Sequence, residues 1–237
     1  MPEAALQTWL RVQALVWLPV LLLLGLRGSA PAEVGWPPIW IQAWVLAMLL
    51  SLASLAWILR SRSLADLVTI VRVAGLLAVV AFGAGQLGYL GWLGAIAVVL
   101  LDLVDGALAR RFGGSPGGAV LDMEADQLTT LGLAALVLSL GGMAHVLLLP
   151  AMRPAFVLAA WWLRIPAHDP KPVNGDNRRG RRICAAVMTA LLVAACPATG
   201  PALRDAVTAI AVLLLVWSFS ADARFLLAHR RGARARA

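Results

Sequence analysis

The chain has 237 residues, 61% of them hydrophobic, with a mean hydropathy of +0.84 and a formal net charge of +8. This composition excludes a soluble globular protein, and no polar stretch between the apolar runs is long enough to fold as a soluble domain. Arginine supplies nearly all of the positive charge, because Lys171 is the single lysine.

Several apolar runs approach the ~20 residues that an α-helix needs to cross a bilayer. We therefore expect an all-α, polytopic transmembrane bundle. The expected spans cover residues 12–26, 39–59, 64–84, 92–108, 122–140, 143–163, 183–196 and 202–219. Pro19 leaves the first span short, Pro150 and Pro154 predict a kink or re-entrant break in the sixth, and residues 221–237 form a basic tail on the membrane surface.

The third expected span carries polar residues. Asp66 is a candidate cap for its start, and Thr69 and Arg72 lie three residues apart on one helix face. An arginine at this depth should face protein rather than lipid. Arg72 is a candidate for neutralising nearby carboxylates or for binding a phosphate, and the competing interpretation is that it extends to the lipid headgroups.

Four aspartates cluster in the stretch from Asp102 to Asp126. Asp102 and Asp105 are three residues apart and Asp122 and Asp126 are four apart, so each pair shares a helix face. Two helix ends meeting across the turn 113–117 would bring the four carboxylates together. Their repulsion in a low dielectric favours a divalent cation, and all-oxygen ligands favour Mg²⁺, Mn²⁺ or Ca²⁺ over zinc.

A carboxylate cluster of this kind can hold two ions, which suits in-line displacement at phosphorus. Gly106 and Ala109 have little or no side chain on the same helix face, so a ligand could approach the backbone there. Arg110 adds a cation suited to phosphate. The alternative is a structural cluster of carboxylates paired with arginines. Cys184 and Cys196 are predicted to be packing residues, and the lone His145 is not expected to be a ligand.

The same stretch resembles the signature of the CDP-alcohol phosphatidyltransferase family, D-x2-D-G-x2-A-R-x8-G-x3-D-x3-D. Its fixed positions are filled by Asp102, Asp105, Gly106, Ala109, Arg110, Gly118, Asp122 and Asp126. One departure is that seven residues, rather than eight, separate Arg110 from Gly118. The shortening falls in a Gly-Gly-Ser-Pro turn, which can lose a residue without changing either helix face. The third span differs too, since Ala65-Asp66 stands where the family has Pro-Asn.

The resemblance implies a six-helix catalytic core. We expect this core at residues 64–225, with two additional N-terminal helices within residues 1–63 and a basic tail at 226–237. The resemblance also implies a homodimer. The sequence does not decide whether the N-terminal helices pack on the side of the core or shape substrate access.

The resemblance further implies transfer of a phosphatidyl group from CDP-diacylglycerol to an alcohol, with release of CMP, in phospholipid biosynthesis. Asp102, Asp105 and Asp122 would hold Mg²⁺ or Mn²⁺, with two ions expected. Asp126 would be the general base and a shared metal ligand. The CDP pocket would be lined by Gly106, Ala109, Arg110 and Gly118. Glycerol 3-phosphate, inositol phosphate, inositol and serine remain open as acceptors.

Three alternatives accompany this interpretation: a transferase that uses a non-lipid CDP-alcohol, a non-catalytic divalent-cation transporter that uses the same carboxylates, and an inactive family member. No nucleic-acid partner is expected.

The longest polar loop, residues 164–182, is strongly basic. One interpretation is a cytoplasmic loop that binds anionic lipids, and the other is capture of a phosphorylated acceptor or of the donor phosphates. The candidate contacts are Arg164, Lys171, Arg178, Arg179 and Arg182, together with Thr69 and Arg72.

With eight spans and a cytoplasmic N-terminus, most of the twenty basic residues fall on the cytoplasmic side. Arg27, Arg153 and Arg204 are then expected on the outer side. The protein is therefore expected in the bacterial plasma membrane, with its aspartate cluster facing the cytoplasm.

Overall fold

The computed structural model describes residues 3–28, 38–60, 63–84, 86–113, 115, 117–162 and 178–234. Within these ranges the chain forms α-helices, one short 3-10 helix and turns, with no strand. The elements are α1 (Glu3–Gly28), α2 (Pro38–Leu59), α3 (Leu64–Gly83), α4 (Tyr89–Phe112), α5 (Gly118–Ser139), η1 (Ala144–Leu147), α6 (Leu148–Trp162), α7 (Arg178–Ala195) and α8 (Pro201–Arg234). The expected all-α helical bundle is confirmed.

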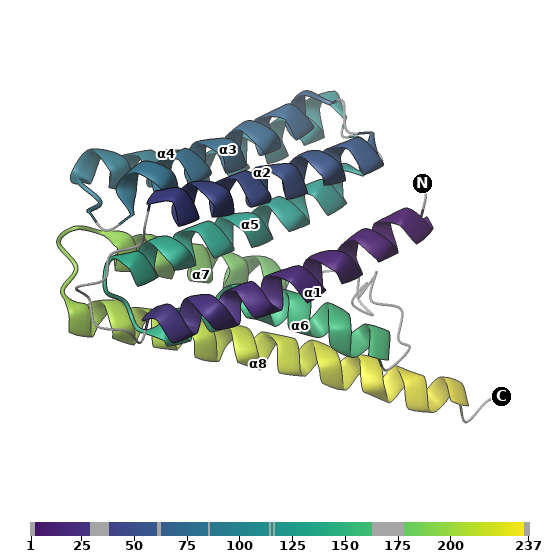
Figure 1. The fold of residues 1–237 in the computed structure, drawn as a ribbon. Helices are drawn as coiled ribbons and strands as arrows, with labels where there is room; N and C mark the ends of the chain where they lie inside the picture. Colours follow the sequence, from purple (N-terminus) through teal and green to yellow (C-terminus); the bar gives the residue numbers. More distant parts are fainter. Residues whose placement is uncertain are drawn as a thin grey trace.

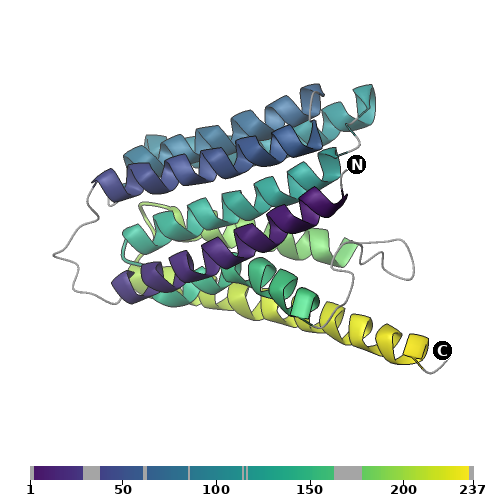
Figure 2. The ribbon, with the colours of Figure 1, turned by 45° about the vertical axis from the view of Figure 1, so that its right-hand side comes forward.

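Successive α-helices run in opposite directions, so that both ends of the chain lie at the same end of the bundle (Figure 1). Helices α2, α3 and α4 form one side, α1, α6 and α8 form the other, and α5 lies between them (Figure 2). Helix α1 packs against α6, and α2 packs against α3 and α5. The two N-terminal helices thus pack on the side of the remaining six.

Five helices have an uninterrupted stretch long and apolar enough to cross a membrane: α1, α3, α4, α8 and the stretch formed by η1 and α6. Helix α2 contributes a shorter apolar stretch, Ala43–Leu59. Helix α5 carries three carboxylates in its first half, and α7 begins with a run of arginines. Of the charged residues of α5, Glu124 is buried, whereas Asp122 and Asp126 are partly exposed.

Helix α3 begins with a reciprocal cap. The Ser63 hydroxyl accepts a hydrogen bond from the Asp66 backbone N–H (3.1 Å), and the Asp66 carboxylate accepts one from the Ser63 N–H (3.1 Å). The N-cap residue is therefore Ser63, and the prediction that Asp66 is the N-cap was wrong. Asp66 is the third residue of the helix and completes a capping box with Ser63. The Asp66 side chain is 3% exposed, so this cap lies inside the bundle.

Three elements differ from the prediction. The sixth span was expected to break near Pro150 and Pro154, but α6 includes both prolines, and the span instead begins with the 3-10 helix η1. The expected surface tail after residue 220 instead continues α8 as helix to Arg234. Helix α1 likewise passes through Pro19, starting well before the predicted span.

Two arginines expected on the outer side, Arg153 and Arg204, make polar contacts within the bundle. Arg153 lies on α6 and pairs with Glu124 of α5. Arg204, 9% exposed, donates to three carbonyls: Ala194 (2.9 Å), Thr199 (3.2 Å) and Leu140. These carbonyls lie at or just beyond the ends of α5 and α7, where the helix itself leaves acceptors unpaired. Arg204 thereby ties three helices together at the end opposite the chain termini.

Replacing Arg204 with methionine should lower the thermal stability of the purified protein. Three buried acceptors would lose their donor, and each unpaired group costs about 1–3 kcal/mol. Thr189→Ala is the control, because the Thr189 hydroxyl is exposed and bonds the Ala185 carbonyl of its own helix. Its effect should stay within about 0.5 kcal/mol. Equal melting temperatures of Arg204→Met and wild type would refute the capping role.

Candidate metal and phosphate site

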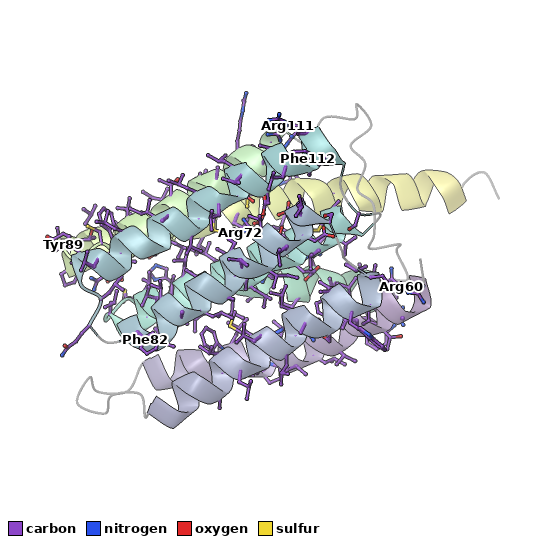
Figure 3. The ribbon with its side chains drawn as sticks, turned by 90° about the horizontal axis from the view of Figure 1, so that it is seen from above. Arg60, Arg72, Phe82, Tyr89, Arg111 and Phe112 are labelled. Carbon is purple, nitrogen blue, oxygen red and sulfur yellow. The ribbon has the colours of Figure 1, made fainter. Side chains whose placement is uncertain are left out.

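The site is built on a buried arginine of α3. Arg72 is 2% exposed and lies between α3, α4 and α5, far from both ends of its helix (Figure 3). A buried guanidinium must find acceptors, since an unpaired charge in an apolar interior is prohibitively expensive. Neighbouring helices supply these acceptors as carboxylates.

All four aspartates of the motif surround this guanidinium. Its Nη1 lies 2.6 Å from Asp102 Oδ1 and 3.1 Å from Asp126 Oδ1, and its Nη2 lies 3.1 Å from Asp122 Oδ1. Its Nε is farther, 3.7 Å from Asp105 Oδ2. The structure therefore decides between the earlier alternatives for Arg72: it neutralises the cluster rather than extending to the headgroups.

Thr69, one turn before Arg72, holds the most buried of these aspartates. Its hydroxyl lies 2.9 Å from Asp105 Oδ2 and 3.1 Å from the Ala65 carbonyl. Asp105 is 4% exposed, whereas the side chains of Asp102, Asp122 and Asp126 are 45%, 48% and 31% exposed. The cluster thus has a fixed inner member and three members that an incoming ligand can reach.

Three of the carboxylates are placed to share a cation. One oxygen each from Asp102, Asp105 and Asp122 lies within 4.8 Å of the others. One guanidinium against four carboxylates leaves a formal charge of about −3 in a low-dielectric setting, which one or two divalent cations would offset. The donor set is all oxygen, the chemistry that Mg²⁺ and Mn²⁺ prefer. These residues therefore fit a hard divalent cation.

The predicted nucleotide residues lie at the rim of this cluster. Gly106, Ala109 and Arg110 occupy the last two turns of α4, and Gly118 starts α5. A methyl group at position 106 would lie 3.3 Å from Arg110 Nη1, so the guanidinium rests over the glycine. A methyl group at position 118 would lie 3.1 Å from Asp66 Oδ1. Both glycines therefore allow a charged side chain to approach the backbone closely.

The turn between α4 and α5 also depends on glycine. Gly113, directly after α4, has φ = +82°, a conformation that residues with a side chain rarely adopt. Ser115 follows, and its hydroxyl is buried without a hydrogen-bond partner among the described residues. The Ser115 carbonyl accepts a hydrogen bond from the Gly118 N–H at 3.0 Å, which joins Ser115 to the start of α5.

The structure places only some of the predicted basic contacts. Arg164 and Lys171 lie outside the described residues, and of Arg178 only its position at the start of α7 is described. Arg182 is exposed on the first turns of α7, and the Arg179 guanidinium lies over the Trp217 ring at 5.7 Å. Residues 178–182 were expected in the basic loop 164–182, but they form the first turns of α7.

Two contacts of this region were not predicted from the sequence. The Cys184 thiol donates to Asp126 Oδ2 across 3.9 Å, which brings α7 to the site. Glu124, between Asp122 and Asp126, pairs with Arg153 on the opposite side of α5. The i+2 offset of Glu124 indicates that it faces away from the aspartates, but the sequence does not identify its partner. Both cysteines are free thiols, and His145 Nε2 lies 2.8 Å from the Thr208 hydroxyl.

Replacing Arg72 with methionine should destabilise the protein and make its stability depend on a divalent cation. Removing one partner of a buried pair costs about 3–5 kcal/mol, and Mg²⁺ would then supply the missing positive charge. The measurement is the melting temperature with a chelator and with Mg²⁺. The Mg²⁺-induced rise should be larger for Arg72→Met than for wild type. Arg111→Met, an exposed neighbour at the end of α4, is the control; identical Mg²⁺ responses in Arg72→Met and wild type would contradict the charge balance described above.

The family model for CDP-alcohol phosphatidyltransferase matches residues 62–217 of the chain, which covers α3 through the first half of α8. No curated protein and no solved structure matches. The matched region contains the four aspartates, Arg72 and the two rim glycines, whereas α1 and α2 precede it. The chain belongs to the CDP-alcohol phosphatidyltransferase family.

Proposed function

We propose that the protein transfers a phosphatidyl group from CDP-diacylglycerol to the hydroxyl of an alcohol and releases CMP, as a step of phospholipid biosynthesis. Family membership supports the general reaction, transfer of a phosphorylated alcohol from a CDP-alcohol. One observation carries the proposal for this chain: four aspartates from two helices converge on one buried guanidinium inside an apolar bundle. With divalent cations bound, such a carboxylate cluster would attract the pyrophosphate of a donor with a lipid anchor.

Asp102, Asp105 and Asp122 would hold Mg²⁺ or Mn²⁺, with two ions proposed and Asp126 as a shared ligand. When bound, the cations would neutralise the pyrophosphate oxygens and the charge left on departing CMP. Thr69 fixes Asp105, and Arg72 pairs with the other three carboxylates. The small surface of Gly106, Ala109 and Gly118 would admit the CDP moiety, and Arg110 would contact its phosphates.

Asp126 is the proposed general base. It is the last carboxylate of the motif and contacts both Arg72 and Cys184. The acceptor oxygen would form a bond to the phosphorus that carries the diacylglycerol, and the bond from that phosphorus to the CMP oxygen would break. The proton of the acceptor hydroxyl passes to Asp126, and CMP leaves with the electron pair of the broken bond.

The basic region around α7 is the proposed place for phosphate groups of the acceptor or of neighbouring anionic lipids. Its members are Arg164, Lys171, Arg178, Arg179 and Arg182. We also propose, following the family resemblance, a homodimer in the bacterial plasma membrane with the site on the cytoplasmic face.

The test is a reconstitution with a mixture of candidate alcohols. Purified protein in vesicles receives CDP-diacylglycerol, Mg²⁺ and isotopically labelled glycerol 3-phosphate, inositol phosphate, inositol and serine, and the lipid product is identified by mass. A parallel reaction offers a non-lipid CDP-alcohol with diacylglycerol. Labelled phospholipid together with CMP is the expected result, and a chelator should abolish both. CMP release at full rate after exhaustive chelation would refute the metal assignment, and ion flux without CMP release would indicate a transporter instead.

Asp126→Asn should block turnover more than donor binding, whereas Asp105→Asn should impair both. Asparagine keeps the size of aspartate but does not take a proton at neutral pH, and loss of a general base costs about 10²–10⁴ in rate. Asp105 is the buried member of the cation group, so its neutralisation should weaken the metal and with it the donor. Metal-dependent CDP-diacylglycerol binding and CMP release are measured for both variants. Near-normal turnover in Asp126→Asn would disprove the base assignment, and equal loss of donor binding would make Asp126 chiefly a metal ligand.

The proposed orientation can be tested on the two ends of α4. Arg111 and Tyr89 lie at opposite ends of this helix and both are exposed (Figure 3). Single cysteines at each position are placed in a chain with Cys184 and Cys196 replaced by alanine. A membrane-impermeant thiol reagent added to intact cells should label Tyr89→Cys and should label Arg111→Cys only after permeabilisation. The opposite pattern would place the site outside the cell.

A further inference from the structure

Helix α5 has a second polar face that the reaction does not use. Successive residues of an α-helix are about 100° apart, so Glu124 lies about 200° around the axis from Asp122, on the side away from Arg72. The residues on this rear side line a pocket between α1, α2, α5 and α6. Those contributed by α5 are Glu124, Gln127, Leu128 and Leu131.

Two contacts fasten the rear side of α5 to α6. Arg153 donates from Nε to Glu124 Oε1 at 3.0 Å, and its Nη2 donates to the same oxygen. One turn on, Gln127 Nε2 donates to the Pro150 carbonyl. The side chains of Glu124 and Arg153 are only 9% and 23% exposed. A buried ion pair adds little net stability because its desolvation offsets its attraction, but it fixes orientation, since breaking it leaves a buried charge.

Helices α1 and α2, which precede the family match, close this rear pocket. Gln13 Oε1 of α1 accepts hydrogen bonds from Trp17 Nε1 (2.7 Å) and from the Ser51 hydroxyl of α2 (2.8 Å), and the three residues line the same pocket as Glu124 and Arg153. Figure 2 shows α1 running alongside α5 and α6. Without this cover the ion pair would face hydrocarbon, where it is costly.

We propose that Glu124 is a positioning residue for the reaction: held by Arg153 and enclosed by α1 and α2, it fixes the rotation of α5 and so aims Asp122 and Asp126 at Arg72. The inference rests on the proposed transfer reaction for its kinetic consequence. Asp122 and Asp126 face Arg72, and Glu124 lies between them in sequence on the opposite side of α5. Rotation of α5 about its axis therefore moves all three carboxylates together. A displacement of about 1 Å in a reacting group can cost 10²-fold in rate. The N-terminal helices thereby contribute to catalysis without touching substrate.

The test compares Glu124→Ala, Glu124→Gln and Gln13→Ala with wild type. Glutamine keeps an acceptor for Arg153, so the expected order of turnover per folded protein is wild type, then Glu124→Gln, then Glu124→Ala with a loss of about 10- to 100-fold. Gln13→Ala should give a smaller loss in the same direction. The KM for the acceptor alcohol should change less than kcat, because no acceptor contact is removed. The Mg²⁺-induced rise in melting temperature should shrink in parallel, since Asp122 would be misplaced.

Asp205→Asn is the matched control. It removes a carboxylate charge that accepts from the Met143 N–H at 3.0 Å, at the opposite end of the bundle. It should lower the melting temperature yet leave kcat and the Mg²⁺ response unchanged. Glu124→Ala with kcat within twofold of wild type and an unchanged Mg²⁺ response would overturn the proposal. If Glu124→Ala does not fold, Glu124→Gln and Gln13→Ala are judged by the same criteria.

The transfer reaction and the positioning role of Glu124 can be refuted independently. A wild-type protein that releases no CMP from any donor would refute the proposed function. The Mg²⁺-dependent melting temperatures of the same variants would still decide whether Glu124 positions the aspartates, because they require no turnover.

Discussion

The structure depends on one electrostatic constraint: four carboxylates and one guanidinium share a small volume inside an apolar bundle. Arg72 contacts Asp102, Asp122 and Asp126 at 2.6–3.1 Å and approaches Asp105 from its Nε. The three helices that carry these residues therefore cannot slide or rotate relative to one another without separating opposite charges in a low dielectric. Packing in the remainder of the bundle holds α3, α4 and α5 in that register.

The same constraint explains why polar groups recur behind the site. Thr69 holds Asp105 from α3, Cys184 reaches Asp126 from α7, and the rear of α5 is fastened by Glu124 to α6. Each contact lies on a different side of the cluster. Because long apolar side chains pack with little directional preference, directional hydrogen bonds are what define the rotation of each helix in such an interior.

The helical class, the number of helices and the convergence of the aspartates could be predicted from the sequence, because hydropathy runs and i, i+3 or i, i+4 spacing are local properties. Helix ends were less predictable. A kink or break was expected at Pro150 and Pro154, yet α6 includes both prolines. The basic residues after 220 resembled a surface tail, although nothing in their composition opposes the continuation of α8.

Long-range pairings could not be predicted for a different reason. Arg153 and Arg204 were assigned to the outer side of the membrane when the basic residues on the two sides were counted. Their actual partners, Glu124 and the carbonyls of Ala194 and Leu140, are distant in sequence, and only packing brings them together. Arg72 was the intermediate case: the sequence indicated that it must face protein, and tertiary structure alone determined that it faces carboxylates.

The arrangement of α1 and α2 has a consequence for how such a core can be extended. In a bundle whose helices alternate in direction, one extra N-terminal helix would place the new terminus on the other side of the membrane or reverse the orientation of the whole core. An antiparallel pair leaves the orientation of the core unchanged, because it returns the chain to its starting side: the starts of α1 and α3 lie at the same end of the bundle in Figure 1. A hairpin of two helices is therefore the smallest unit that can be added ahead of α3 without changing which compartment the aspartates face.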